Sequence, residues 1–140
     1  MTVTRAVLFV NDDIEMCNSI KDALLCEKYF CYFANNSAEA LKFMKQEEIA
    51  VIVSEINYKS MEGLKLLKEI KKNYPKTVKV LMSDYLDIEN IFYEIGTIDL
   101  YNYILKPTRI DEKFNILINE AVEHFEKNNK EEIAGVLSVV

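Results

Sequence analysis

Two kinds of apolar pattern alternate five times along the 140-residue chain. Short continuous apolar runs, typical of strands buried on both faces, alternate with segments in which apolar residues recur at steps of three and four, which is typical of helices. The expected strands are 6–10, 29–34, 49–53, 78–82 and 101–105, and the expected helices are 14–25, 38–47, 61–73, 87–95 and 110 to about 126. Because parallel strands need right-handed crossovers that carry helices, this pattern predicts one α/β domain with both sheet faces covered.

Local signals refine the expected helix ends. Ser37 and Asp87 are predicted N-caps, because a side-chain oxygen there accepts a hydrogen bond from a free backbone N–H. Tyr74 and Pro75 are predicted to end the third helix, since the residue before a proline disfavours the helical region. We expect the folded domain to occupy residues 1–127, with residues 128–140 forming a C-terminal tail or a truncated linker to an output domain.

Composition excludes several classes of function. The net charge of −6 argues against nucleic-acid binding by this domain, because phosphate contacts need a basic face. A local group of lysines is interpreted as a solvated helix face: Lys68, Lys71, Lys72, Lys76 and Lys79. No apolar stretch approaches the ~20 residues of a membrane helix, and residues 1–5 do not resemble a signal peptide. We therefore expect a cytoplasmic protein that contacts no membrane.

Cys17, Cys26 and Cys31 form no CxxC pair, and the single histidine, His124, lies far along the chain. A zinc site needs four ligands or a tight cluster of three, so these residues do not predict one. Reduced, buried cysteines that act as small apolar residues are the expected state.

Polar side chains follow four of the expected strands, and ligands of open parallel sheets bind at the carboxyl ends of the strands. These residues are Asn11, Asp12 and Asp13 after the first strand, Ser54 and Glu55 after the third, Ser83 and Asp84 after the fourth, and Lys106 and Pro107 after the fifth. Acidic groups gathered at one edge repel one another unless a cation compensates, and Mg²⁺ prefers such oxygen ligands. The pattern predicts an acyl-phosphate pocket or its remnant.

In these residues the chain resembles the receiver domain of two-component response regulators, from about Arg5 to Phe125. The matching segments are 10–13, 61–63, Ser83 and 103–107, in the order and at the strand ends that the family has. The resemblance implies a flavodoxin-like, doubly wound parallel sheet of five strands in the order 2-1-3-4-5.

The family's roles carry over position by position. Asn11 and Asp12 take the places of the acidic pair, with Asp13 just after it. Counting eight residues back from Gly63 places Glu55 at the position of the phosphate-accepting aspartate. The remaining positions give an invariant lysine, a switch hydroxyl, an aromatic switch and an implied cis peptide before a proline: Lys106, Ser83, Tyr103 and Pro107.

Departures from the family pattern decide the expected function. The extra methylene of Glu55 moves its carboxylate by ~1.5 Å, which impairs in-line attack on a phosphoryl donor and also places a negative charge near the phosphoryl position. Tyr58 and Lys59 replace the usual Met-Pro, and Asp84 replaces a small residue beside the pocket. Asn11 removes one charge from a magnesium site built from Asp12, Asp13 and Glu55, so any Mg²⁺ is expected to bind weakly.

Each of these residues also has a purely structural interpretation. Asp12 and Asp13 are candidate caps of the first helix, and Ser83 is a candidate cap of a short turn. Glu55 is alternatively a solvent-facing residue at a strand end, and Tyr103 a half-buried strand residue. Lys106 fits a charge partner for the carboxylates better than a random surface position.

The favoured function is that of an atypical pseudo-receiver, which signals by protein–protein interaction and catalyses at most its own phosphorylation and dephosphorylation. The alternative is a working magnesium-dependent phosphoreceiver of a His-to-Asp phosphorelay. A flavin-binding domain of the same topology is disfavoured, because no glycine-rich loop follows the first strand. Expected partners are a sensor histidine kinase or other signalling protein, and a second copy contacting the face of the fourth helix, fifth strand and fifth helix, where Ile88, Ile91 and Phe92 contribute.

Overall fold

The computed structural model describes residues 4–56, 61–106 and 109–139, without the side chains of residues 85, 86, 88 and 131–139. The strands are β1 (Ala6–Val10), β2 (Phe30–Ala34), β3 (Val51–Glu55), β4 (Val78–Ser83) and β5 (Asn102–Leu105). The helices are α1 (Ile14–Ala23), α2 (Ser37–Gln46), α3 (Glu62–Asn73), α4 (Tyr85–Ile95) and α5 (Glu112–Val139).

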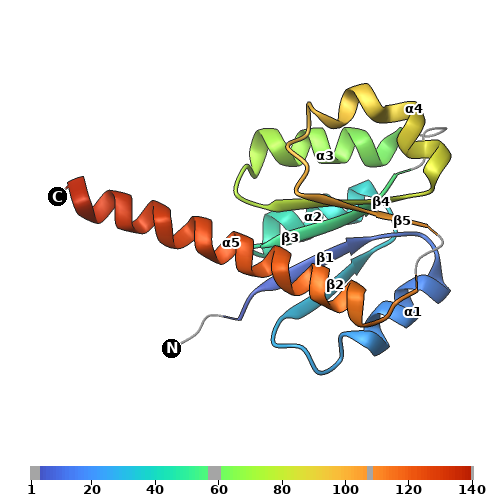
Figure 1. Ribbon diagram of the computed structural model, residues 1–140, viewed down its shortest axis with the longest axis horizontal. Helices are drawn as coiled ribbons and strands as arrows, with labels where there is room; N and C mark the ends of the chain where they lie inside the picture. The colour runs from blue at the N-terminus through green and yellow to red at the C-terminus, as the bar shows by residue number, and fades with distance from the viewer. Residues whose placement is uncertain (1–3, 57–60, 107–108, 140) are drawn as a thin grey trace.

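The five strands form one parallel sheet in the order β2-β1-β3-β4-β5, which confirms the predicted topology. Helices α1 and α5 cover one face, and α2, α3 and α4 cover the other (Figure 1). The central strands β1, β3 and β4 are buried almost throughout, as their continuous apolar runs predict.

Two apolar clusters hold these layers together. Alternate residues of each strand point to opposite faces, so Leu8 and Ile52 pack under α2 and α3 while Val7 and Val53 pack under α1 and α5. The predicted apolar face of the last helix is confirmed, with Phe114, Ile118, Ala121 and Phe125 buried. Burying such side chains is the main stabilising contribution, at roughly 1.5–3 kcal/mol for each large one.

The predicted helix caps are wrong in two places. Asn36, not Ser37, caps α2, since its Oδ1 accepts a hydrogen bond from the Glu39 N–H at 2.9 Å. Asp84, not Asp87, caps α4, and its Oδ1 accepts from the Asp87 N–H at 2.8 Å. Both helices therefore begin earlier than expected. The end of α3 at Asn73, before Tyr74 and Pro75, is as predicted.

The last helix is longer than the sequence predicts. An end near Glu126 was expected, but α5 continues as one helix to Val139. Its first half packs on the sheet, and its second half projects from the rest of the molecule (Figure 1). Arg5 contacts α5 near the place where the helix leaves the sheet. Its guanidinium lies 5.1 Å from the Phe125 ring centroid and forms ion pairs with Glu126 at 3.4 Å and with Glu48 at 3.7 Å.

Candidate functional site

The order of the sheet places a cavity at the carboxyl ends of β1 and β3. In the sheet, β2 lies on one side of β1 and β3 lies on the other, so the strand order reverses between β1 and β3. Ligands of such sheets bind at this point of reversal. A cavity of about 290 Å³ lies there, lined by Val10, Asn11, Asp12, Asn35, Asn36, Ser37, Glu55, Glu62 and Gly63. We call it the carboxyl-edge cavity. It brings Asp12 and Glu55 together, as predicted from the strand ends.

The ammonium group of Lys106 contacts Glu55 directly. Lys106 Nζ donates a hydrogen bond to Glu55 Oε1, and the two side chains are 25% and 22% exposed. The ion pair connects the end of β5 with the end of β3, and β4 lies between these two strands. The Lys106 N–H also donates a hydrogen bond to the Ser83 carbonyl, at the end of β4, at 2.8 Å. Partial burial strengthens such an ion pair relative to one in open water. The interpretation of Lys106 as a charge partner therefore agrees with the structure.

Gly63 lies against the backbone of Glu55. A Cβ added at Gly63 would clash with the Glu55 carbonyl oxygen and lie 3.0 Å from an Ile56 side-chain carbon, so a larger residue has no space. Two residues earlier, Met61 is the N-cap of α3 and adopts a left-handed conformation with φ of 56°. Close packing of α3 on the end of β3 thus fixes where the Glu55 backbone lies.

Asn11 is buried and its side chain is used by the local fold. Its Oδ1 accepts a hydrogen bond from the Asp13 N–H at 2.8 Å, and its Nδ2 lies 3.9 Å from the Met82 sulfur. Its carbonyl accepts from the Cys17 thiol at 3.7 Å. Burial raises the pKa of Cys17, which keeps that thiol protonated. Asn11 organises the turn after β1.

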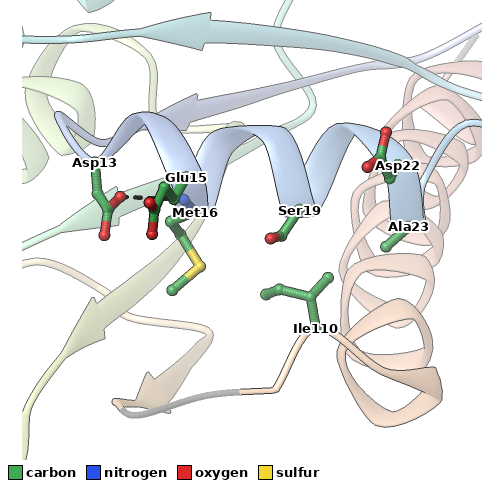
Figure 2. Close-up of a pocket in the computed structure, with 7 residues that line it drawn as sticks. All are labelled: Asp13, Glu15, Met16, Ser19, Asp22, Ala23 and Ile110. Carbon is green, nitrogen blue, oxygen red and sulfur yellow. Dashed lines mark hydrogen bonds between the residues drawn. The ribbon is translucent and has the colours of Figure 1, made fainter.

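Asp13 belongs to a different cavity. Its Oδ1 caps α1 by accepting from the Met16 N–H at 3.1 Å, which is the structural role considered for it above. Figure 2 shows its carboxylate beside Glu15 on α1, and Ile110 facing α1 from the segment before α5. These residues line a cavity of about 640 Å³. Asp12 lies on the carboxyl-edge cavity instead.

The three carboxylates predicted to hold magnesium are therefore not gathered. Asp13 caps α1, whereas Asp12 and Glu55 line the carboxyl-edge cavity and one oxygen of Glu55 is held by Lys106. Across residues 4–56, 61–106 and 109–139, no group of three or more His, Cys, Asp or Glu side chains is arranged to hold a metal ion. The donor set fits a magnesium ion poorly.

The remaining predicted site residues lie at the ends of β4 and β5. Ser83 is buried, and its Oγ donates to the Asp84 carbonyl at 3.2 Å. Asp84 is exposed and serves as the cap of α4. Tyr103 is 50% exposed on β5, so it is neither buried in the core nor in the cavity lining. Tyr58, Lys59 and the Lys106–Pro107 peptide lie outside the described residues.

Apolar side chains are exposed on each of the three elements α4, β5 and α5. They are Phe92 and Tyr93 of α4, Tyr103 and Leu105 of β5, and Ile116 of α5. The expectation that Ile91 contributes to this face is wrong, because Ile91 is buried in the cluster under α2, α3 and α4. The side chain of Ile88 lies outside the described residues.

Two expectations about other polar groups need correction. Cys26 is exposed, so the three cysteines are not all buried. Lys79 does not belong to a solvated helix face: it lies in β4 and is 3% exposed. Its sequence neighbours signal a strand, but nothing in the sequence indicates that the lysine itself is buried.

Residues 7–118 match the sequence model of the response regulator receiver domain family. This match covers most of the chain, which therefore belongs to the response regulator receiver domain family. No helix among the described residues combines the length and apolar character needed to span a bilayer.

Related proteins carry similar domains within longer chains. The transcriptional regulator NtrC of Proteus hauseri is 32% identical over 138 residues, which are 94% of this chain and 28% of NtrC. The regulatory protein AtoC of Escherichia coli is 26% identical over 123 residues, which are 88% of this chain and 26% of AtoC. The chain thus spans about a quarter of the length of these curated relatives.

Solved structures share the fold. A CheY-like response regulator receiver domain from Methanospirillum hungatei superposes with a TM-score of 0.78 at 26% identity, covering 90% of this chain and 99% of that one. A signal receiver domain from Pseudomonas fluorescens gives a TM-score of 0.82 at 24% identity, covering 93% and 96% of the two chains. The predicted flavodoxin-like receiver fold is confirmed.

Proposed function

We propose that this chain is an atypical receiver domain that signals through protein–protein contacts, with Glu55 at the position where the family accepts phosphate. The observation that carries this proposal is the ion pair between Lys106 and Glu55 beside the carboxyl-edge cavity. The glutamate supplies a permanent negative charge, and the lysine binds it without a phosphoryl group. The β3 and β5 ends are then joined in every copy of the domain.

The other residues of the cavity favour the same conclusion. Asn11 replaces an acid and its side-chain oxygen is engaged by the Asp13 N–H, while Asp13 caps α1. A phosphoryl donor would meet Asp12, Glu55 and Glu62 without an assembled metal ion, and these carboxylates repel its oxygens. We expect weak magnesium binding at most.

The first experiment tests for covalent phosphorylation. The chain is incubated with Mg²⁺ and a small acyl phosphate donor, and its intact mass is measured. We expect no stable gain of a phosphoryl group by the native chain. A gain that disappears in Glu55→Gln would contradict the proposal and favour the alternative, a magnesium-dependent phosphoreceiver.

A matched variant separates the effect of residue 55 from that of the rest of the pocket. Glu55→Asp shortens the side chain by one methylene, keeps the charge and restores the family's residue. Phosphorylation of this variant but not of the native chain supports the assignment of Glu55. The Lys106→Met change in the Glu55→Asp background serves as the control, because it removes the cation without adding bulk.

Partners are inferred from the exposed face of α4, β5 and α5. Phe92, Tyr93 and Ile116 present large apolar side chains to solvent there, which is typical of contact surfaces. We propose a second copy of the chain as one occupant, a sensor histidine kinase or other signalling protein as a further partner, and an output domain beyond residue 128. Analytical ultracentrifugation tests the dimer: native protein should dissociate less readily than Tyr93→Ser, while Ile14→Ser, on the exposed start of α1, serves as the control.

A further inference from the structure

Lys79 is a buried cation that forms no ion pair with a carboxylate within the described part of the chain, although Asp99 lies close enough to influence its pKa. The residue is 3% exposed, and its Nζ donates to the Thr77 carbonyl at 3.0 Å. None of the ion pairs formed within residues 4–56, 61–106 and 109–139 includes it. Burial of a charged group is unfavourable unless an opposite charge compensates it. An anion bound beside Lys79 would compensate this buried charge.

A cavity lies beside this lysine, at the amino ends of β4 and β5. Its volume is about 390 Å³, and its lining consists of Pro75, Lys76, Thr77, Val78, Lys79, Asp99, Leu100, Tyr101, His124 and Asn128. We call it the amino-edge cavity. Because parallel strands share their direction, it lies at the opposite edge of the sheet from Glu55 and is a separate site.

Positive charge is concentrated around this cavity although the chain carries a net charge of −6. Lys76 and Lys79 line it, and Lys71 lies close enough to influence Lys79 electrostatically. Burial lowers the pKa of Lys79 most strongly, Asp99 opposes that shift, and Lys71 adds to it. Asp99 is the one carboxylate in the lining, and it forms no ion pair with Lys79 among the described residues.

Two hydrogen-bonding side chains of α5 complete the lining. The imidazole of His124 lies 3.3 Å from the amide of Asn128, and its ring contacts that of Tyr101 in a tilted arrangement with centroids 4.6 Å apart. These contacts orient an imidazole and an amide on α5 beside the two lysines of the α3–β4 segment. Cationic and neutral donors that surround one hollow are the usual means of binding an oxyanion.

We propose that the amino-edge cavity is a binding site for a small oxyanion, with Lys79 as its buried cation and Lys76, His124 and Asn128 as surrounding donors. The ligand class is a compound with a phosphate or carboxylate group, and the probes are inorganic phosphate and acetate. Binding is reversible and involves no covalent step. This inference goes beyond the proposed receiver function, since it concerns another edge of the sheet and another class of ligand.

Amide resonances of a uniformly ¹⁵N-labelled chain test the proposal. Phosphate or acetate is added at constant ionic strength, with chloride as the replaced ion, and the shifts of Lys79, Tyr101, His124 and Asn128 are followed. We expect saturable shifts at these residues for at least one of the two probes, and the probe that gives them identifies the anion. Shifts confined to the carboxyl-edge cavity, or absent with both probes, would overturn the proposal.

Matched variants separate a binding site from a structural lysine. Lys79→Met should abolish the saturable shifts, whereas Lys72→Met, the same change on the exposed side of α3, should leave them unchanged. Asp99→Asn should tighten binding by about two- to fivefold, because it removes from the lining a negative charge that repels the anion. If Lys79→Met still binds the anion, or if Asp99→Asn weakens it, the site is wrongly assigned.

Thermal unfolding without any added oxyanion provides a second readout. A buried charge awaiting a ligand destabilises the empty protein, so Lys79→Met should unfold at a higher temperature than the native chain. A lysine kept only for its hydrogen bond to Thr77 would give the opposite result, a lower unfolding temperature, and that result would count against the proposal.

Discussion

Two lysines at opposite edges of the sheet differ in how their charge is compensated. At the carboxyl edge, Lys106 is partly exposed and pairs with Glu55. At the amino edge, Lys79 is almost fully buried, donates a hydrogen bond to the Thr77 carbonyl and forms no ion pair within the described residues. At the carboxyl edge the charge of Lys106 is compensated by Glu55, whereas at the amino edge no ion pair compensates the charge of Lys79 among the described residues. The same fold therefore holds one cation in a closed interaction and leaves another ready for a ligand.

The largest expected effect comes from Gly63, which sets the shape of the carboxyl edge. Gly63→Ala places a Cβ against the Glu55 carbonyl, so we expect a loss of about 1–3 kcal/mol in the free energy of unfolding. Urea unfolding measures it. Gly96→Ala is the control, because nothing lies within 4 Å of the added Cβ and the φ of −62° suits alanine. Equal effects of the two changes would mean that α3 does not pack closely on β3.

The second test asks whether the Lys106–Glu55 pair is favourable in itself. We expect Glu55→Gln and Lys106→Met each to lower the free energy of unfolding by about 1 kcal/mol, a modest value because both side chains are about a quarter exposed. The double variant should cost less than the two single changes together. A double-mutant cycle measures this coupling, and strict additivity would show that the pair does not stabilise the edge.

A third, comparable effect concerns the role of Asp84 beside the same edge. Asp84→Ala removes the cap of α4 and should cost about 1 kcal/mol, whereas Asp84→Asn keeps a capping oxygen and should cost only a few tenths. Chemical denaturation of both variants checks this. If instead the asparagine variant loses as much as the alanine variant, the charge of Asp84 acts on the site and not only on its helix.

The smallest effect is a change with pH at the amino edge. Burial lowers the pKa of Lys79 below the 10.5 of an unfolded lysine, so in the interval below 10.5 the unfolded chain binds more protons. This group then makes the folded state more stable as the pH rises. The advantage of Lys79→Met over the native chain should shrink as the pH approaches 10.5. An advantage that stays constant or grows would contradict the burial of a charged lysine.

The sequence predicts the framework well because periodicity and burial are local. All five strands and five helices, the sheet order and the gathering of Asp12 and Glu55 follow from apolar runs, strand ends and the resemblance to receivers. The sequence does not determine the N-cap of α2, since Asn35, Asn36 and Ser37 are adjacent and all suit the position. Only backbone geometry decides which one is extended.

Other failures arise from contacts that are distant in sequence. The length of α5 was underestimated because a helix that leaves the sheet no longer needs one apolar face, so its period fades. The sequence does not predict the burial of Lys79, because burial of a strand residue depends on packing by other elements of the fold. Asp12 and Asp13 line different cavities because of the turn after β1, in which the Asp13 N–H donates to the Asn11 side chain.

The length of α5 has a mechanical consequence. At 1.5 Å per residue, the segment beyond Phe125, a side chain that packs on the sheet, extends for about 20 Å. A stiff rod pivoting at that point magnifies small changes at its base, so a rotation of about 10° at Phe125 sweeps its far end through about 4 Å. Arg5, which contacts Phe125 and Glu126, lies at the base of this segment, where such a rotation would begin.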